Sequence, residues 1–79
     1  MNLDIISPAA SHHYEVAWVE LNTPVGNMII QPGHAPLVIT LSPNKPLVYC
    51  LKNGKQEVFT PTRAVAEVTR THITILVSE

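Results

Sequence analysis

Cysteine and glycine are scarce in this 79-residue sequence, and each scarcity excludes a class of site. The single cysteine, Cys50, permits neither an intramolecular disulfide nor a cysteine-based metal cluster. The three glycines, Gly26, Gly33 and Gly54, are too scattered to form a phosphate-binding loop. No apolar run approaches the ~20 residues that span a bilayer. The chain must therefore be held by one modest packed core, with or without a partner.

Charged residues make up only 14% of the chain, and the net charge at pH 7 is −1. Soluble domains usually contain roughly 25% charged residues. This balance gives no electrostatic basis for binding nucleic acid or an anionic membrane surface. Two explanations stay open. In the first, Thr, Asn and Gln provide the polar surface. In the second, a protein partner covers part of the surface, because interfaces are depleted in Lys, Glu and Asp.

Short apolar runs separated by turn residues predict an all-β domain. Turn signals recur roughly every 8–12 residues, and no segment has a useful helical period. We expect about eight strands, near residues 2–7, 14–21, 26–30, 37–41, 47–51, 56–60, 64–69 and 72–77. Because one flat sheet would expose a face, we expect a flattened barrel or β-sandwich of antiparallel strands spanning the single domain 1–79.

One dipeptide predicts a particular hairpin. Asn53-Gly54 lies between two apolar runs, which is the strongest short hairpin signal in a sequence. We expect a type I′ turn there, with positive φ at both central residues.

Alternation in residues 14–21 divides the side chains between two faces of a predicted strand. One face would hold the odd-numbered residues from Ala17 to Leu21, and the other the even-numbered residues from Tyr14 to Trp18. Trp18 is then either a core residue or, if Val19 and its neighbours face inward, an exposed contact residue that shares its face with Tyr14.

Catalytic and metal-binding patterns are weak. His13 and Glu15 would share one side of a strand, and His34 or His72 could complete a metal site, but the spacing matches no known ligand set. A hydroxyl, an imidazole and a carboxylate are present in Ser7, His34 and Asp4. Nothing beyond their presence supports a catalytic triad. We therefore predict no catalytic residue, no metal, no cofactor and no enzyme activity.

The most distinctive segment is Q-P-G-H-A-P-L-V, residues 31–38. Pro32 and Pro36 fix φ near both ends of this turn, and Gly33 supplies a backbone conformation that other residues resist. Such a pre-ordered turn loses little entropy when it docks. His34 would either orient the turn through a hydrogen bond or contact a neighbouring chain.

Residues 32–37, P-G-H-A-P-L, resemble the signature of the epsilon subunit of bacterial rotary ATP synthases, called delta in mitochondria. The resemblance extends in order along nearly the whole chain. Residues 3–7 are similar to the opening strand L-x-V-V-(S/T), and residues 54–59 to the G-x-x-E-x-F hairpin. Residues 67–77 are similar to the terminal L-E-V…V-T-V-L-A-D.

The sequence departs from this family at three places. Residues 62–64 read T-R-A where the family has a Ser-Gly-Gly turn, and residues 24–28 read P-V-G-N-M in place of an acidic, Gly-rich segment. The sequence ends at Glu79, after the last expected strand, whereas typical members continue into a two-helix hairpin. We therefore expect no C-terminal helical hairpin.

The resemblance implies a ten-stranded β-sandwich, so the expected number of strands is about eight to ten. It implies a non-catalytic central-stalk (rotor) subunit of a rotary ATP synthase that links the gamma subunit to the membrane c-ring and supports proton- or sodium-coupled ATP synthesis. Nucleic acid and small-molecule substrates are not expected partners. The location would be peripheral, on the cytoplasmic face of the inner or plasma membrane, through the complex. The alternative is a free-standing β-sandwich protein-binding module in another assembly.

The resemblance also implies contact residues for each partner. Those on the c-ring side would be Gly26, Asn27, Met28, Pro32, Gly33 and His34. Tyr14 and Trp18, if they share the outward face of their strand, would be the contact residues on the gamma side.

Overall fold

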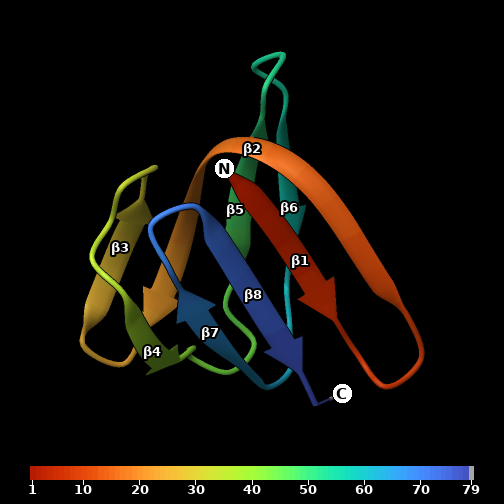
Figure 1. Cartoon of the computed structure of the whole chain (residues 1–79). Helices are drawn as coiled ribbons and strands as arrows, with labels where there is room; N and C mark the ends of the chain where they lie inside the picture. Colours follow the sequence, from red (N-terminus) through yellow and green to blue (C-terminus); the bar gives the residue numbers. More distant parts are fainter. Residues whose placement is uncertain (79) are drawn as a thin grey trace.

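Eight β-strands and no helix are found in residues 1–78, the part of the chain that the computed structural model describes (Figure 1). The strands are β1 (Asn2–Ile6), β2 (Ser11–Thr23), β3 (Gly26–Ile30), β4 (Leu37–Thr40), β5 (Leu47–Leu51), β6 (Gln56–Phe59), β7 (Ala64–Val68) and β8 (His72–Val77). The all-β prediction is confirmed strand by strand, with β2 longer than expected at both ends. The ten strands that the resemblance implies are not reached within these residues.

The strands form two layers that share the long strand β2. In sheet A the order is β4-β7-β8-β1, followed by the N-terminal part of β2. In sheet B, β3 and β5 flank the C-terminal part of β2, and β6 pairs with β5. Figure 1 shows β2 arching from one layer to the other. The end strands β4 and β6 do not pair with each other, so the sandwich is unclosed.

One strand pair departs from the expected antiparallel arrangement. Strands β1 and β8 are parallel, with Asn2 opposite His72 and Ile6 opposite Leu76. The turn after β7 returns the chain to the end of sheet A at which β1 begins, so β8 runs in the same direction as β1. This pairing brings the two ends of the chain onto neighbouring strands.

A β-bulge in β2 decides which of its side chains face the core. Val16 and Trp18 pair with consecutive residues of β5, so Ala17 is an extra residue in the ladder. Before the bulge the even-numbered Val16 is buried, and after it the odd-numbered Val19 and Leu21 are buried. The unbroken alternation expected from the sequence is therefore wrong at this point.

The core lies between the two sheets and takes alternate side chains from nearly every strand. Its largest fully buried members are Leu3, Leu21, Ile30, Leu47, Ile73, Ile75, Val16, Val19 and Val68. Burying a side chain of this size contributes about 1.5–3 kcal/mol relative to leaving it in water. Thr23 is the one buried polar residue among those described, and its hydroxyl donates a hydrogen bond to the carbonyl of Gly26 at 2.7 Å.

The hairpin between β5 and β6 forms where expected but with a different turn. Only Gly54 has positive φ (+91°) in this hairpin, so the type I′ expectation is wrong. The N–H of Gly54 donates to the carbonyl of Leu51 at 2.9 Å, and the N–H of Lys55 donates to Oδ1 of Asn53 at 2.9 Å. A turn with negative φ at its centre, followed by a left-handed glycine, produces this pattern. Asn53 stabilises the turn through its side chain rather than through its backbone.

The structure contains no helix long and apolar enough to cross a membrane, within the residues described.

Candidate functional site

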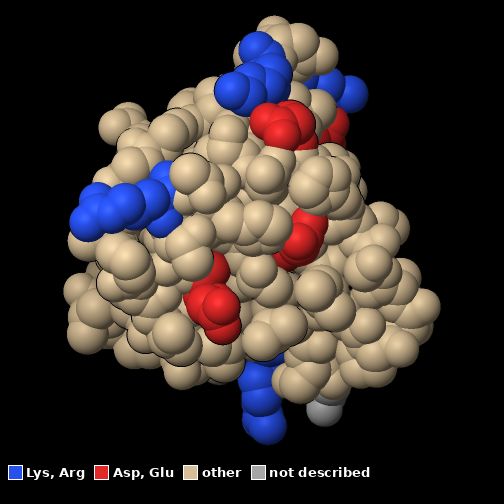
Figure 2. Space-filling model, viewed as in Figure 1, with Lys and Arg blue, Asp and Glu red and all other residues tan. Residues whose placement is uncertain are grey.

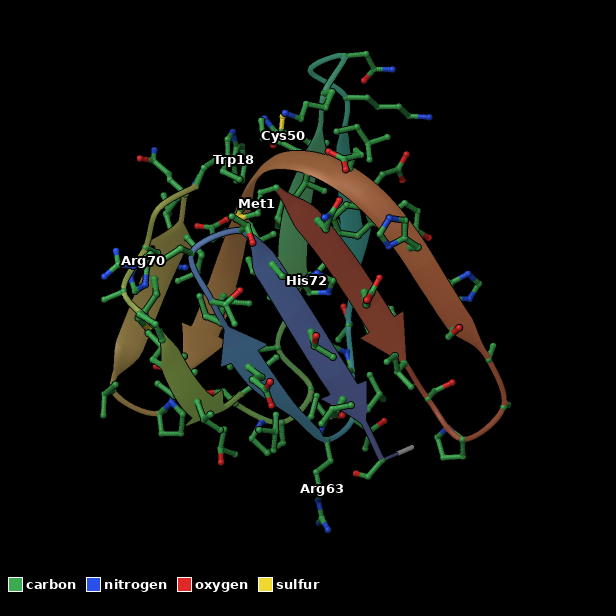
Figure 3. The ribbon with its side chains drawn as sticks, viewed as in Figure 1. Met1, Trp18, Cys50, Arg63, Arg70 and His72 are labelled. Atoms are coloured by element: carbon green, nitrogen blue, oxygen red, sulfur yellow. The ribbon has the colours of Figure 1, made fainter. Side chains whose placement is uncertain are left out.

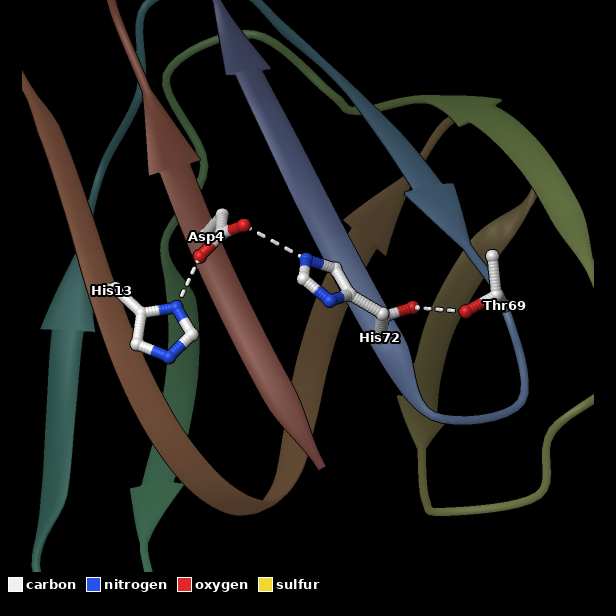
Figure 4. Close-up of polar contacts among 4 residues, drawn as sticks. All are labelled: Asp4, His13, Thr69 and His72. Carbon is white, nitrogen blue, oxygen red and sulfur yellow. Dashed lines mark hydrogen bonds and ion pairs between the residues drawn. The ribbon is translucent and has the colours of Figure 1, made fainter.

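Asp4 lies at the centre of a polar cluster on the outer face of sheet A (Figure 4). One of its carboxylate oxygens contacts Nδ1 of His13, and the other accepts a hydrogen bond from Nε2 of His72 at 2.8 Å. Strand β1 lies between β2 and β8, so Asp4 has an imidazole on either side. The backbone carbonyl of His72 accepts hydrogen bonds from the N–H and the hydroxyl of Thr69, at 2.8 and 3.2 Å. The cluster therefore ties three strands and the turn before β8.

The pKa of the Asp4 carboxyl lies below its ordinary value of 3.8. The hydrogen bond with His13 is the largest cause, because it favours the charged carboxylate. Partial burial opposes this effect, and His72 adds to the lowering. Asp4 is thus a carboxylate at neutral pH and acts as an acceptor for both imidazoles.

Metal binding finds no support in this cluster. No three His, Cys, Asp or Glu side chains in residues 1–78 are grouped so that they could hold a metal ion. His13 is bonded to Asp4, whereas a carboxylate oxygen of Glu15 lies 3.8 Å from the N-terminal amine of Met1. The structure does not bring His13 and Glu15 together as common ligands.

The turn at residues 31–36 is braced against the turn between β7 and β8. The N–H of Gly33 donates to the carbonyl of Arg70 at 2.7 Å, and the Arg70 guanidinium donates to the carbonyl of Gly33 at 3.3 Å. Gly33 has φ of +87°, which confirms that it supplies a left-handed conformation. The ring Nδ1 of His34 bonds the carbonyl of Ala35 at 2.7 Å, so His34 orients the turn locally. No sequence pattern predicted that Arg70, labelled in Figure 3, would brace this turn.

Ser7, His34 and Asp4, which hold the three chemical groups of a catalytic triad, each form hydrogen bonds with other residues. The hydroxyl of Ser7 donates to the carbonyl of Ala10 at 3.1 Å, closing the loop between β1 and β2. His34 bonds its own turn, and Asp4 bonds two other histidines. The structure does not assemble these three side chains.

The residues expected on the c-ring side fall into two groups at opposite ends of β3. Gly26, Asn27 and Met28 begin the strand, next to the tip of the β2–β3 hairpin, where Val25 is 85% exposed. Asn27 is exposed, and its amide donates to Glu20 at 3.1 Å. The other group, residues 32–34, follows the far end of β3 (Figure 1).

The residues expected on the gamma side lie on opposite faces of β2. Tyr14 packs against the core, and its ring centroid lies 4.9 Å from that of Tyr49. Trp18 lies opposite Cys50 on the outer face of sheet B, and both residues are labelled in Figure 3. The expectation of a shared face is wrong because the extra residue Ala17 reverses the alternation between them.

The outer faces of the two sheets differ in polarity. The face of sheet A carries the Asp4 cluster together with Glu67, and Figure 2 shows its carboxylates among uncharged side chains, with Lys and Arg at the border. The strand registers place five apolar side chains, three amides and one carboxylate on the face of sheet B, namely Trp18, Ile29, Val48, Cys50, Val58, Asn22, Asn27, Gln56 and Glu20. Ile29 is 54% exposed and Val58 is 65% exposed. The outer face of sheet A also carries the exposed Ile6, Val38 and Leu76, so sheet B is distinguished by having a single charged group on its strands.

Comparison with known proteins agrees with this architecture. The family model described as "ATP synthase, Delta/Epsilon chain, beta-sandwich domain" matches residues 1–79. A chain in the cryo-EM structure of the Euglena gracilis mitochondrial ATP synthase (OSCP/F1/c-ring, rotational state 1) superposes with a TM-score of 0.85 at 22% identity, over 98% of this chain and 49% of that chain. A chain of the Tetrahymena thermophila mitochondrial ATP synthase central stalk/c-ring structure gives 0.81 at 18% identity, over 100% and 63%.

The present chain thus spans only about half to two thirds of the length of these solved chains. At such low identity the superpositions establish the fold alone. Comparison with curated proteins gives no match.

Proposed function

Because the chain belongs to the ATP synthase delta/epsilon family, as its β-sandwich domain, we propose that it serves as a non-catalytic central-stalk subunit of a rotary ATP synthase. In this role it links the gamma subunit to the membrane c-ring and supports proton- or sodium-coupled ATP synthesis. The observation that carries the proposal is the family match over residues 1–79. The domain would be peripheral to the membrane, on the cytoplasmic face of the inner or plasma membrane, and would need no cofactor or substrate of its own.

The outer face of sheet B is the surface that we assign to the gamma subunit. Trp18 is half-buried there, with the exposed Ile29 on the neighbouring strand β3. The single charged group of this face, Glu20, already accepts a hydrogen bond from Asn27 at 3.1 Å. Interface cores are poor in charge, and Trp is the residue type most enriched among energetic hot spots. Tyr14 would support this surface from the core side rather than touch gamma.

The tip of the β2–β3 hairpin is the surface that we assign to the c-ring. Val25 projects into solvent, and Asn27 offers an exposed amide beside it. The buried Thr23 fixes the hairpin through its bond to Gly26, so the tip is pre-ordered. Residues 32–34 lie at the other end of β3, and we therefore assign them a bracing role with Arg70 rather than a share in the same contact.

Co-purification tests the two assignments separately. The tagged chain would be mixed with recombinant gamma subunit and with detergent-solubilised c-ring from the same organism. We expect Trp18→Ala to weaken gamma binding about 30-fold, since a hot-spot truncation costs about 2 kcal/mol or more. Val25→Ser should reduce c-ring retention alone, because Val25 is 85% exposed at the hairpin tip. Ile6→Ala is the control, because Ile6 lies on the outer face of sheet A and is 38% exposed.

Binding by the wild-type chain distinguishes the stalk subunit from the free-standing binding module. Retention of gamma and the c-ring by the wild-type chain supports the stalk role, and its melting temperature should rise when gamma is added, since a partner that binds only the folded state stabilises it. A wild-type chain that retains neither partner would reject the stalk role in favour of the free-standing binding module.

A further inference from the structure

Strand β4 has a free edge whose backbone groups point away from the rest of sheet A. β4 pairs with β7 alone. The N–H of Leu41 donates to the carbonyl of Ala64 at 3.0 Å, so these two residues form a hydrogen-bonded pair at the end of the ladder. Hydrogen-bonded pairs alternate in an antiparallel ladder, and therefore Ile39 also bonds β7. The N–H and C=O groups of Val38 and Thr40 face outward instead.

Two of the other free edges carry titratable side chains of the kind that protect an edge from pairing. The β6 edge holds Glu57, which bonds Lys55 at 3.2 Å, and the outer edge of β2 begins with His12, His13 and Glu15. The β3 edge has no titratable side chain, but its Asn27 amide donates to the carboxylate of Glu20 on β2 at 3.1 Å, which places a charge beside that edge. β4 reads L-V-I-T and has no titratable side chain.

An uncharged free edge is a template for another strand. Val38 adds an apolar side chain that is 70% exposed in the middle of β4. An extended polypeptide backbone matches the alternating donors and acceptors that Val38 and Thr40 present. The backbone groups of this edge therefore fit an extended protein segment.

We infer that an extended, uncharged strand of a partner protein pairs with the free edge of β4 and adds a further strand to sheet A. The inference rests on the proposed function for the identity of that partner, the gamma subunit. The backbone of the partner strand hydrogen-bonds Val38 and Thr40, and an apolar side chain of the partner covers Val38.

A second copy of the chain is the less suitable occupant. Self-pairing about a two-fold axis would align four residues per copy, which buries much less than the roughly 1,200 Å² of a stable interface. Gamma, which by our assignment also contacts sheet B, can gain its affinity from both surfaces.

Amide hydrogen exchange of the full-length, ¹⁵N-labelled chain tests the inference, with recombinant gamma subunit as the probe. Adding gamma should slow exchange of the Val38 and Thr40 amides at least tenfold. The amide of Ile39, which bonds β7, is the internal control and should be protected with and without gamma.

A matched pair of substitutions accompanies the exchange measurement. Val38→Lys places a charge on the edge and should weaken gamma binding at least tenfold with an unchanged melting temperature. Leu76→Lys is the control, because Leu76 is exposed on the same face but its strand is paired on both sides. Equal loss of binding in both variants would overturn the edge assignment.

The remaining outcomes separate this inference from the proposed function. If gamma binds while the Val38 and Thr40 amides still exchange fast, strand pairing is wrong and the stalk role stands. If gamma does not bind the wild-type chain, both fail. If the chain alone dimerises in size-exclusion chromatography with those amides protected, a second copy occupies the edge and the inference is overturned.

Discussion

Asp4→Asn isolates the contribution of one carboxylate to the stability of this chain. The Asp4 carboxylate bonds His13 on β2 and His72 on β8, and so ties both strands to β1. Asparagine has nearly the same volume but only one acceptor oxygen, with an NH₂ group in place of the other. One imidazole N–H would then face a donor, and its hydrogen bond would be lost.

The magnitude follows from the exposure of the three side chains. The side chain of Asp4 is 28% exposed, that of His72 is 35% exposed, and that of His13 is 61% exposed. Exposed ion pairs contribute about 0–1 kcal/mol, whereas hydrogen bonds to buried charged groups contribute more. We expect Asp4→Asn to lower the free energy of unfolding by about 1 kcal/mol, which corresponds to a fall in Tm of about 4–8 °C for a domain of this size.

The sign of the pH dependence follows from the lowered pKa of Asp4. A carboxyl whose pKa is lower in the folded than in the unfolded chain stabilises the fold above its unfolded pKa. This contribution is lost as the pH falls through the folded pKa, which lies below 3.8. The difference between wild type and Asp4→Asn should therefore be complete near pH 7 and shrink as the pH falls below 3.8 toward the folded pKa.

Urea denaturation of both proteins at pH 7 and at a series of pH values below 3.8 is the measurement. Glu67→Gln is the control, since Glu67 is an exposed carboxylate on the same face of sheet A with no hydrogen-bond partner among the residues described. Its effect should stay within about 0.5 kcal/mol. Equal stability of Asp4→Asn and wild type at pH 7, or a difference that does not shrink as the pH is lowered through this range, would refute the role of the carboxylate.

Three further predictions concern the turn and the core. Gly33→Val should lower the free energy of unfolding by about 1–2 kcal/mol in urea melts, because a β-branched residue resists φ of +87° although no atom blocks its Cβ, and Gly33→Asn should cost less. Leu3→Ala should cost about 2–5 kcal/mol by circular dichroism melts, because Leu3 is fully buried, whereas a loss below ~1 kcal/mol would argue against its core position. Burial raises the pKa of Tyr49, so an absorbance titration should show one of the two tyrosines un-ionised near pH 11 until the chain unfolds, with stability lost as the pH rises.

The strands were predictable because their signals are local. Alternating apolar residues and intervening Pro, Gly and Asn turns mark each strand, and the bounds of β3, β5 and β8 match the expected ranges. The left-handed conformation of Gly33 was predictable for the same reason, because a Pro followed by a Gly favours a turn in which the Gly has positive φ. The type of the Asn53-Gly54 turn was not, because two turn families accept the same dipeptide and the ladder register selects between them.

The polar cluster was not predictable, because its members come from distant parts of the sequence. His13 follows Asp4 by nine residues, but His72 follows it by 68. Their meeting depends on the parallel pairing of β1 with β8, which no local pattern encodes. The brace between Gly33 and Arg70 has the same origin, since it spans 37 residues.

The bulge at Ala17 links the fold most directly to the proposed function. A regular strand as long as β2 would keep one set of alternate residues facing inward along its whole length. β2 instead serves sheet A with its first half and sheet B with its second, and the extra residue lies where it passes from one to the other. With unbroken alternation after Val16, Trp18 would point into a core already filled by Tyr49 and its neighbours. The bulge turns Trp18 outward beside Cys50, and the face that we assign to gamma therefore depends on one extra residue in β2.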